Sequence, residues 1–187
     1  MRVQIDVDGV LADFTLAFTH LAAEWELTDY SWPTTEQDSW DFNFDTEFVW
    51  KVVKDSYNWW MLLVPLVTPE EVSKLNEAIE KHDVYFVTNR PSTKGLSAEM
   101  QTRYWLSSIG VLVDHASVIA TKVGTKGKLA AALNIDIAID DKPENIMEIS
   151  AENITCVVRA WKYNEKLPHK RVYSLKQFLE EYLGEQR

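Results

Sequence analysis

Near its start the chain carries two aspartates one residue apart, Asp6 and Asp8, followed directly by Gly9. Further polar segments follow apolar runs much later: Thr88-Asn89-Arg90, Lys126 and Asp140-Asp141. Carboxylates suit a hard cation such as Mg²⁺, and a carboxylate beside a phosphoryl group can attack it in line. A second carboxyl group can carry protons to the leaving oxygen and from water, and a lysine can compensate the charge. These residue types predict phosphoryl chemistry at a metal site.

Strands alternating with helices would bring these segments together. The sequence predicts strands over 2–7, 83–88, 117–120, 136–140 and 154–158. It predicts helices over 13–26, 46–57, 69–81, 95–109, 126–133 and 175–183, and another that begins at Pro143. This alternation is typical of an α/β protein with a doubly wound, mostly parallel, Rossmann-like sheet. Ligands bind such a sheet at the carboxyl ends of its strands, where the polar segments lie.

The first connection of this predicted sheet is unusually long. It spans roughly 75 residues, far beyond an ordinary crossover. Six of the eight tryptophans precede residue 61, and residues 28–45 are aromatic and rich in turn formers. We therefore expect a small helical cap over residues 14–65, inserted into an α/β core made of 1–13 and 66–187.

Composition excludes several classes of protein. The formal charge is −10, with 19 basic and 29 acidic side chains, which argues against a nucleic-acid polymer as the main partner. Cys156 is the single cysteine, so no internal disulfide forms, and its place in an apolar run predicts a core residue. No signal peptide and no membrane-spanning run is evident, so we expect a cytoplasmic protein without a membrane partner. The sequence leaves a homodimer open.

The polar segments also resemble a known superfamily. Asp6-Val-Asp8-Gly9-Val10 resembles the DxDGV signature of the haloacid dehalogenase-like (HAD) phosphohydrolases. Thr88-Asn89, Thr125-Lys126-Gly127 and Asp140-Asp141 are similar to the second, third and fourth motifs of that superfamily, in the same order. The resemblance spans nearly the whole chain, and it implies a HAD-like core.

Roles for individual residues follow from this resemblance. It implies that Asp6 is the nucleophile and that Asp8 is the general acid and base. It implies Mg²⁺ held by Asp6, by the backbone carbonyl of Asp8 and by Asp141, with Asp140 behind them. Lys126 would be the catalytic lysine. Lys128 is a competitor and Lys122 a weaker one; residues 126 and 128 of one helix face different directions, so only one of these two can serve.

The aromatic run Trp59 to Leu66 and the tail segment Trp161 to Asn164 are similar to the 5'(3')-deoxyribonucleotidases. This shorter resemblance implies a nucleoside monophosphate as the substrate. Thr88 and Asn89 would then donate hydrogen bonds to the phosphate. Arg90 would reach the same phosphate or pair with acidic side chains. The residues that could line a slot for the base, or simply pack in the core, are Phe14, Phe18, Trp59 and Trp60.

These observations predict a Mg²⁺-dependent phosphomonoester hydrolase, a 5'-nucleotidase that acts through an aspartyl-phosphate. One alternative is a phosphatase of the same fold that acts on a sugar phosphate or another small phosphomonoester. A second alternative is a non-catalytic, receiver-like domain that binds Mg²⁺ and accepts a phosphoryl group. A P-loop nucleotide-binding protein is disfavoured because the chain contains no GxxxxGK[ST] motif.

Overall fold

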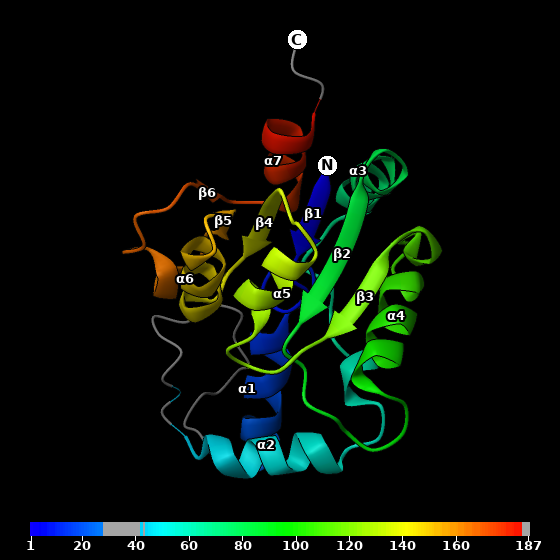
Figure 1. Ribbon diagram of the computed structural model, residues 1–187. Coiled ribbons are helices and arrows are strands. Elements are labelled where there is room, and N and C mark those ends of the chain that lie inside the picture. Colours follow the sequence, from blue (N-terminus) through cyan, green and yellow to red (C-terminus); the bar gives the residue numbers. More distant parts are fainter. Residues whose placement is uncertain (28–41, 43, 185–187) are drawn as a thin grey trace.

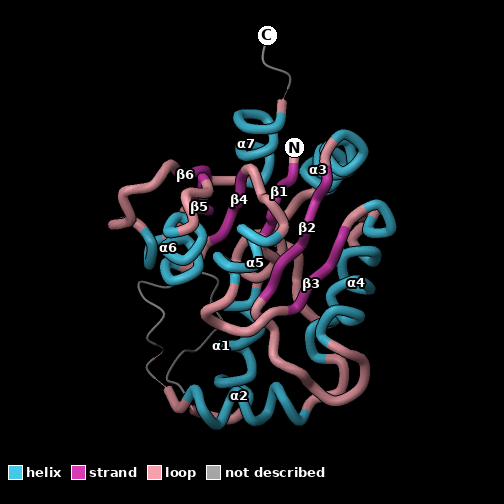
Figure 2. Tube along the Cα trace, in the orientation of Figure 1, coloured by secondary structure: helices cyan, strands magenta, loops and turns pink. Residues whose placement is uncertain are grey.

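The structure is a computed structural model that describes residues 1–27, 42 and 44–184. Within these residues, six strands form one parallel sheet in the order β3-β2-β1-β4-β5-β6 (Figures 1 and 2). The strands are β1 (Arg2–Ile5), β2 (Asp83–Thr88), β3 (Ser117–Ala120), β4 (Ile137–Asp140), β5 (Thr155–Arg159) and β6 (Arg171–Val172). The predicted doubly wound α/β fold is confirmed. The sequence did not predict β6, which is only two residues long and shows no periodicity.

Helices precede or follow these strands along most of the chain. They are α1 (Phe14–Glu24), α2 (Thr46–Asp55), α3 (Pro69–Lys81), α4 (Ala98–Ser108), α5 (Lys126–Ala132), α6 (Pro143–Ala151) and α7 (Leu175–Phe178). A π-helical turn, Leu179–Leu183, continues α7, and short 3₁₀ turns lie at Trp59–Met61, Val113–His115 and Lys162–Asn164. Apart from α7, which ends at Phe178 and reaches the predicted end at 183 only with the π-helical turn, the ends of the predicted elements differ from the observed ones by no more than three residues. The largest shift is at α4, because the side chain of Ser97 caps that helix by accepting a hydrogen bond from the Met100 amide.

Helices cover both faces of the sheet. Ile139 and Val157 point into a large apolar cluster that includes residues of α3, α4 and α7. Ala138 and Cys156, their neighbours along the same strands, point into a smaller cluster with α5 and α6. Burial on both faces is the reason why these strands are almost continuously apolar.

The segment after β1 turns sharply before it enters α1. Gly9 has a φ of +78°, and its amide donates to the carbonyl of Ala12 at 2.8 Å. Asp13 then caps α1 by accepting a hydrogen bond from the Leu16 amide at 2.9 Å. This tight turn holds Asp6 and Asp8 at the rim of the sheet and directs the chain away from it.

Helices α1 and α2 lie beyond the carboxyl ends of the strands, with α2 across the base of the molecule in Figure 1. The aromatic residues Phe14, Phe18 and Trp60 are buried in this region, and they belong to the same apolar cluster as the sheet. The residue range predicted for the cap, 14–65, includes both α1 and α2. The turn-rich character predicted for 28–45 falls mostly outside the described residues. In the described part of the chain, no helix has both the length and the apolar character needed to cross a membrane.

Candidate active site

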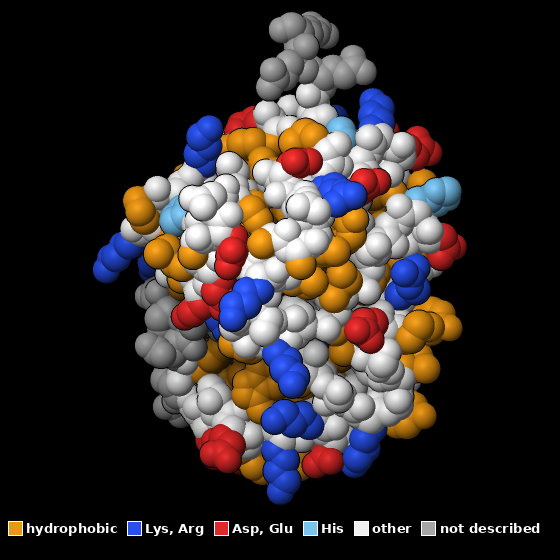
Figure 3. Space-filling model, viewed as in Figure 1, with side chains coloured by type: hydrophobic (Ala, Val, Ile, Leu, Met, Phe, Trp, Pro, Cys, Tyr) orange, Lys and Arg blue, Asp and Glu red, His pale blue; other side chains and the backbone are white. Residues whose placement is uncertain are grey.

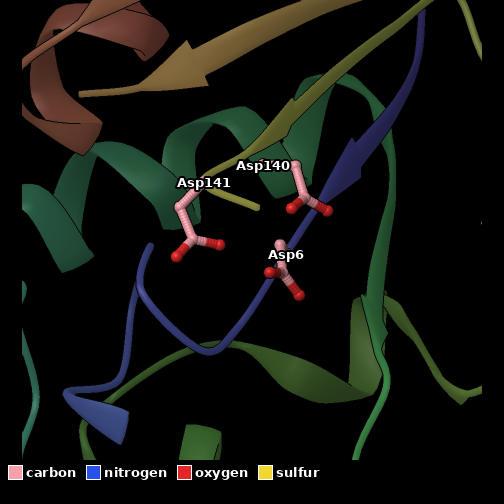
Figure 4. A group of neighbouring side chains, drawn as sticks. All are labelled: Asp6, Asp140 and Asp141. Atoms are coloured by element: carbon pink, nitrogen blue, oxygen red, sulfur yellow. The ribbon is translucent and has the colours of Figure 1, made fainter. Parts of the chain in front are cut away.

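The candidate site lies between β1 and β4, where the order of the strands along the chain reverses. Asp6 follows β1 directly, and its amide donates to the carbonyl of Ile139 in β4 at 3.0 Å. This places Asp6 beside Asp140 and Asp141, which end β4 and begin the next loop. The three side chains point toward one another (Figure 4), and one carboxylate oxygen of each lies within 4.8 Å of one oxygen of each of the others. In open α/β sheets this switch point is where ligands bind.

Lys126, the first residue of α5, holds two of these carboxylates together. Its Nζ lies 2.7 Å from Asp6 Oδ1 and 2.7 Å from Asp140 Oδ2, and its side chain is buried. Gly127 permits this placement because a Cβ there would lie 2.3 Å from the carbonyl oxygen of Glu148 in α6. The two other lysines considered from the sequence, Lys122 and Lys128, are exposed.

Burial and crowding alter the ionisation of these groups. Burial, helped by the nearby Asp140 carboxylate, raises the pKa of Asp6 well above its ordinary range. The same two causes raise the pKa of Asp141 to about 7. Burial by itself favours the neutral amine of Lys126, but the carboxylates of Asp140 and Asp6 outweigh it and raise the lysine's pKa. If all three carboxyl groups of Asp6, Asp140 and Asp141 were ionised beside the Lys126 ammonium group, the cluster would carry an excess of two negative charges, and this crowding contributes to the raised pKa values of Asp6 and Asp141.

The donors around each carboxylate indicate which ones suit a metal. Asp140 already accepts hydrogen bonds from Lys126 Nζ, from Asn145 Nδ2 at 3.0 Å and from the Lys142 amide at 3.0 Å. Asp141 accepts one from the Tyr163 hydroxyl, and the Asp6 carboxylate lies 2.7 Å from Lys126 Nζ. Oxygen ligands and an excess of two negative charges fit Mg²⁺, with Asp6 and Asp141 as the carboxylates best placed to hold it.

The surroundings of Asp8 differ from those of Asp6. Its carboxylate accepts a hydrogen bond from Thr88 Oγ1 at 3.1 Å and pairs with Arg90, whose Nη2 lies 2.7 Å from Asp8 Oδ1. Asn89, the residue between them, donates its side-chain amide to the carbonyls of Thr121 and Lys122. The two aspartates of the motif therefore contact different cationic side chains: Asp6 contacts Lys126, and Asp8 contacts Arg90.

A pocket of about 410 Å³ opens onto these groups. Eight of the predicted site residues line it: Asp6, Asp8, Phe14, Trp60, Thr88, Asn89, Lys126 and Asp141. Four others are buried and do not line it: Phe18, Trp59, Arg90 and Asp140. In the space-filling view, basic side chains lie around an apolar hollow on the lower half of the visible face (Figure 3).

The pocket also contains residues that the sequence analysis did not select. Trp50 and Lys54 line it from α2, and Lys142 and Asn145 line it from the start of α6. The spacing of Trp50 and Lys54, four residues apart on a predicted helix, was a signal that the two share one face. Asn145 gave no such signal, because its contact with Asp140 depends on the turn that begins α6.

Known structures share this architecture at low sequence identity. The chain matches a haloacid dehalogenase-like family hydrolase from Streptococcus pneumoniae with a TM-score of 0.58 and 10% identity, over 95% of this chain and 96% of that one. It matches a D,D-heptose 1,7-bisphosphate phosphatase from Burkholderia thailandensis with a TM-score of 0.54 and 14% identity, over 97% of each chain. It matches a β-phosphoglucomutase from Clostridium difficile with a TM-score of 0.55 and 16% identity, over 97% of this chain and 94% of that one.

These matches assign the fold. The chain has the fold of the HAD-superfamily hydrolases, as its motifs implied. No family model and no curated protein sequence matches this chain.

Proposed function

We propose that the protein is a Mg²⁺-dependent phosphomonoester hydrolase that acts on nucleoside monophosphates through an aspartyl-phosphate at Asp6. One observation carries the proposal: a single pocket joins the carboxylates of Asp6, Asp8 and Asp141 to an aromatic wall. Its volume, about 410 Å³, lies within the range of small-molecule sites. Phosphoryl chemistry and an organic leaving group would thus share one enclosed space.

In the proposed reaction, a carboxylate oxygen of Asp6 attacks phosphorus while the bond from phosphorus to the ester oxygen breaks. Asp8 gives its proton to that departing oxygen. In the second step water attacks phosphorus, Asp8 takes the proton from this water, and the bond between phosphorus and Asp6 breaks. Inorganic phosphate leaves, and both aspartates return to their starting states.

Other residues would compensate charge and orient the phosphoryl group. Lys126 lies 2.7 Å from Asp6 and would balance the negative charge that gathers around the nucleophile. Thr88, at the end of β2, would donate to a phosphoryl oxygen when its hydroxyl turns from Asp8. Mg²⁺ held by Asp6, Asp141 and the carbonyl of Asp8 would act as a Lewis acid on a phosphoryl oxygen.

The aromatic wall supports a nucleobase as the organic part. The rings of Phe14 and Trp50 stack with centroids 5.6 Å apart and an interplanar angle of 22°. Trp60 lies nearly parallel to Phe14, at 6.3 Å and 26°. Phe14 and Trp60 are buried, so Trp50, which is only partly buried, is the ring that would stack on a planar base. Stacking of a base on an aromatic side chain contributes about 1–3 kcal/mol.

A sugar phosphate is the second candidate. Lys54, Lys142 and Asn145 line the same pocket and could bind hydroxyl or phosphate groups. Two structures of the same fold are those of proteins named for a phosphorylated sugar, the heptose bisphosphate phosphatase and the β-phosphoglucomutase.

A substrate panel with matched variants tests the proposal. Mononucleotides and sugar phosphates are compared with Mg²⁺ and with EDTA; the nucleotidase proposal predicts higher kcat/KM for mononucleotides and loss of activity in EDTA. Asp6→Asn should abolish turnover in a folded protein. Trp50→Ala should lower kcat/KM for nucleotides by about tenfold, while Trp25→Ala, a tryptophan that is 54% exposed at the end of α1, should not. Substantial turnover by Asp6→Asn would disprove the mechanism, and a uniform preference for sugar phosphates would disprove the substrate class.

A further inference from the structure

Arg90 makes an unusually complete set of contacts for a residue next to a substrate pocket. Its side chain is fully buried, and it pairs with Asp8 through Nη2 at 2.7 Å and Nε at 3.0 Å. Its third nitrogen, Nη1, donates to Thr102 Oγ1 at 3.0 Å. All three nitrogens of the guanidinium group therefore already donate within the protein. Two parallel hydrogen bonds to one carboxylate fix its orientation as well as its position.

Two tryptophans hold the guanidinium group in place. Its Cζ lies 4.9 Å from the ring centroid of Trp60 and 5.8 Å from that of Trp105. Each indole is itself anchored, because Trp60 Nε1 donates to the carbonyl of Pro91 at 2.8 Å and Trp105 Nε1 donates to that of Leu63 at 2.7 Å. Cation–π contact with anchored rings restricts Arg90 to this one geometry.

The sequence alone allowed two roles for Arg90, contact with the substrate phosphate or pairing with an acidic group. In the structure Arg90 is not among the residues that line the pocket, whereas Asp8 lines it, with its side chain 19% exposed. A carboxylate has about four lone-pair sites, and Arg90 Nε, Arg90 Nη2 and Thr88 Oγ1 supply three donors. One site is left for the proton that the reaction moves.

We infer that Arg90 is a positioning residue that fixes the carboxyl group of Asp8 for proton transfer and does not bind the phosphate. This inference rests on the proposed function. Trp60 extends the arrangement, because it both lines the pocket and covers Arg90. The aromatic wall that would contact the leaving group therefore also holds the residue that orients the acid.

The test compares a poor and a good leaving group. A 5'-mononucleotide loses an alkoxide and needs the proton from Asp8, whereas p-nitrophenyl phosphate loses a stable phenolate and does not. With Arg90→Met, kcat for the nucleotide should fall by about 100-fold or more, since general acid–base catalysis contributes about 10²–10⁴-fold. KM and the inhibition constant of inorganic phosphate should change by less than about threefold, because no ground-state contact is lost.

With p-nitrophenyl phosphate, Arg90→Met should give a rapid burst of about one p-nitrophenol per active site, followed by slow turnover. The burst arises because Asp6 is phosphorylated without help, but the hydrolysis of the aspartyl-phosphate still needs Asp8 as a base. Arg90→Lys, which keeps the charge but loses the two-pronged contact, should lie between wild type and Arg90→Met, and it provides the same test if the methionine variant does not fold. The matched control is Arg103→Met, which removes an arginine of α4 that pairs with Asp114, and both rates should stay as in wild type.

Several outcomes would overturn the inference. A tenfold or greater rise in the inhibition constant of phosphate would make Arg90 a phosphate ligand. A smaller burst with an unchanged rate per active site would make it a structural residue only, and an unchanged or higher kcat for the nucleotide would mean that Asp8 does not depend on it. If wild type releases phosphate from neither substrate, the proposed function fails first, and this inference fails with it.

Discussion

Replacement of Lys126 by methionine tests whether this lysine stabilises the buried carboxylates by compensating their charge. Lys126 is 1% exposed and lies 2.7 Å from both Asp6 and Asp140, which are themselves buried. Methionine fills similar space without charge, so the substitution isolates the electrostatic contribution. The variant would remove the ammonium group that contacts Asp6 and Asp140 and leave the three carboxyl groups of Asp6, Asp140 and Asp141 together.

The expected magnitude follows from this burial. Removal of one partner from a buried ion pair typically costs about 3–5 kcal/mol, because the remaining charge stays desolvated and unpaired. We expect Lys126→Met to lower the free energy of unfolding in EDTA by about 3–5 kcal/mol. The double variant Lys126→Met/Asp140→Asn also lacks the Asp140 carboxylate, so it should regain about half of the lost free energy of unfolding. Mg²⁺ should also stabilise the single variant, because it binds the folded state and not the unfolded one.

Urea unfolding followed by tryptophan fluorescence measures these changes. At about 2–3 kcal/mol per molar urea, the midpoint for Lys126→Met should fall by about 1–2 M. Lys128→Met, two residues along the same helix but exposed, is the matched control and should change the free energy by less than about 0.5 kcal/mol. A loss below about 1 kcal/mol for Lys126→Met, or no recovery in the double variant, would refute the view that Lys126 compensates the buried carboxylates.

Three further predictions concern other positions. Gly9→Ala should lower the free energy of unfolding by about 2 kcal/mol or more in urea titrations, because φ is +78° and a Cβ would lie 2.0 Å from Asp141 Oδ2. Gln4→Met should raise that free energy by about 1 kcal/mol, since within the described residues neither polar atom of the buried Gln4 amide has a hydrogen-bond partner. Cys156 should resist iodoacetamide at pH 8 in the native protein and react in urea, because burial raises the pKa of its thiol and excludes the reagent; mass spectrometry detects the adduct. Gly124→Ala is the control for Gly9→Ala, because φ there is +82° but nothing lies within 4 Å of the added Cβ. An equal loss in both glycine variants, a destabilised Gln4→Met protein, or rapid native labelling of Cys156 would contradict the respective prediction.

The fold could be predicted from the sequence because its signals are local. Apolar strands, capping residues such as Thr68 and prolines at the first turns of α3 and α6 mark the elements within a few residues. The four polar segments were predictable as a group because parallel strands bring their carboxyl ends to one edge. The two-residue strand β6 was not, since its pairing with β5 is specified by tertiary contacts and not by its own pattern.

The contacts that tune the site were hidden for a different reason. Arg90 and Asp8 are 82 residues apart, and Tyr163 and Asp141 are 22 apart, so no local pattern links them. Trp161 Nε1 donates to the carbonyl of Gly9 across 152 residues. Such partners are determined by how strand ends meet in space. Spacing could locate the carboxylates, but it could not say which donor each one receives.

The order of the sheet explains how two aspartates, two residues apart at one strand end, could take different roles. β1 lies between β2 and β4, so the chain after β1 has a different neighbour on each side. On the β4 side, Asp6 meets Asp140 and Lys126, is 5% exposed and has a raised pKa. On the β2 side, Asp8 meets Thr88 and Arg90 and stays open to the pocket. An attacking carboxylate needs a cation that compensates charge, whereas a proton carrier needs a fixed orientation and an open lone pair. The neighbouring strands supply these two environments separately, so the division of roles that we propose for Asp6 and Asp8 would follow from strand order more than from the aspartates themselves.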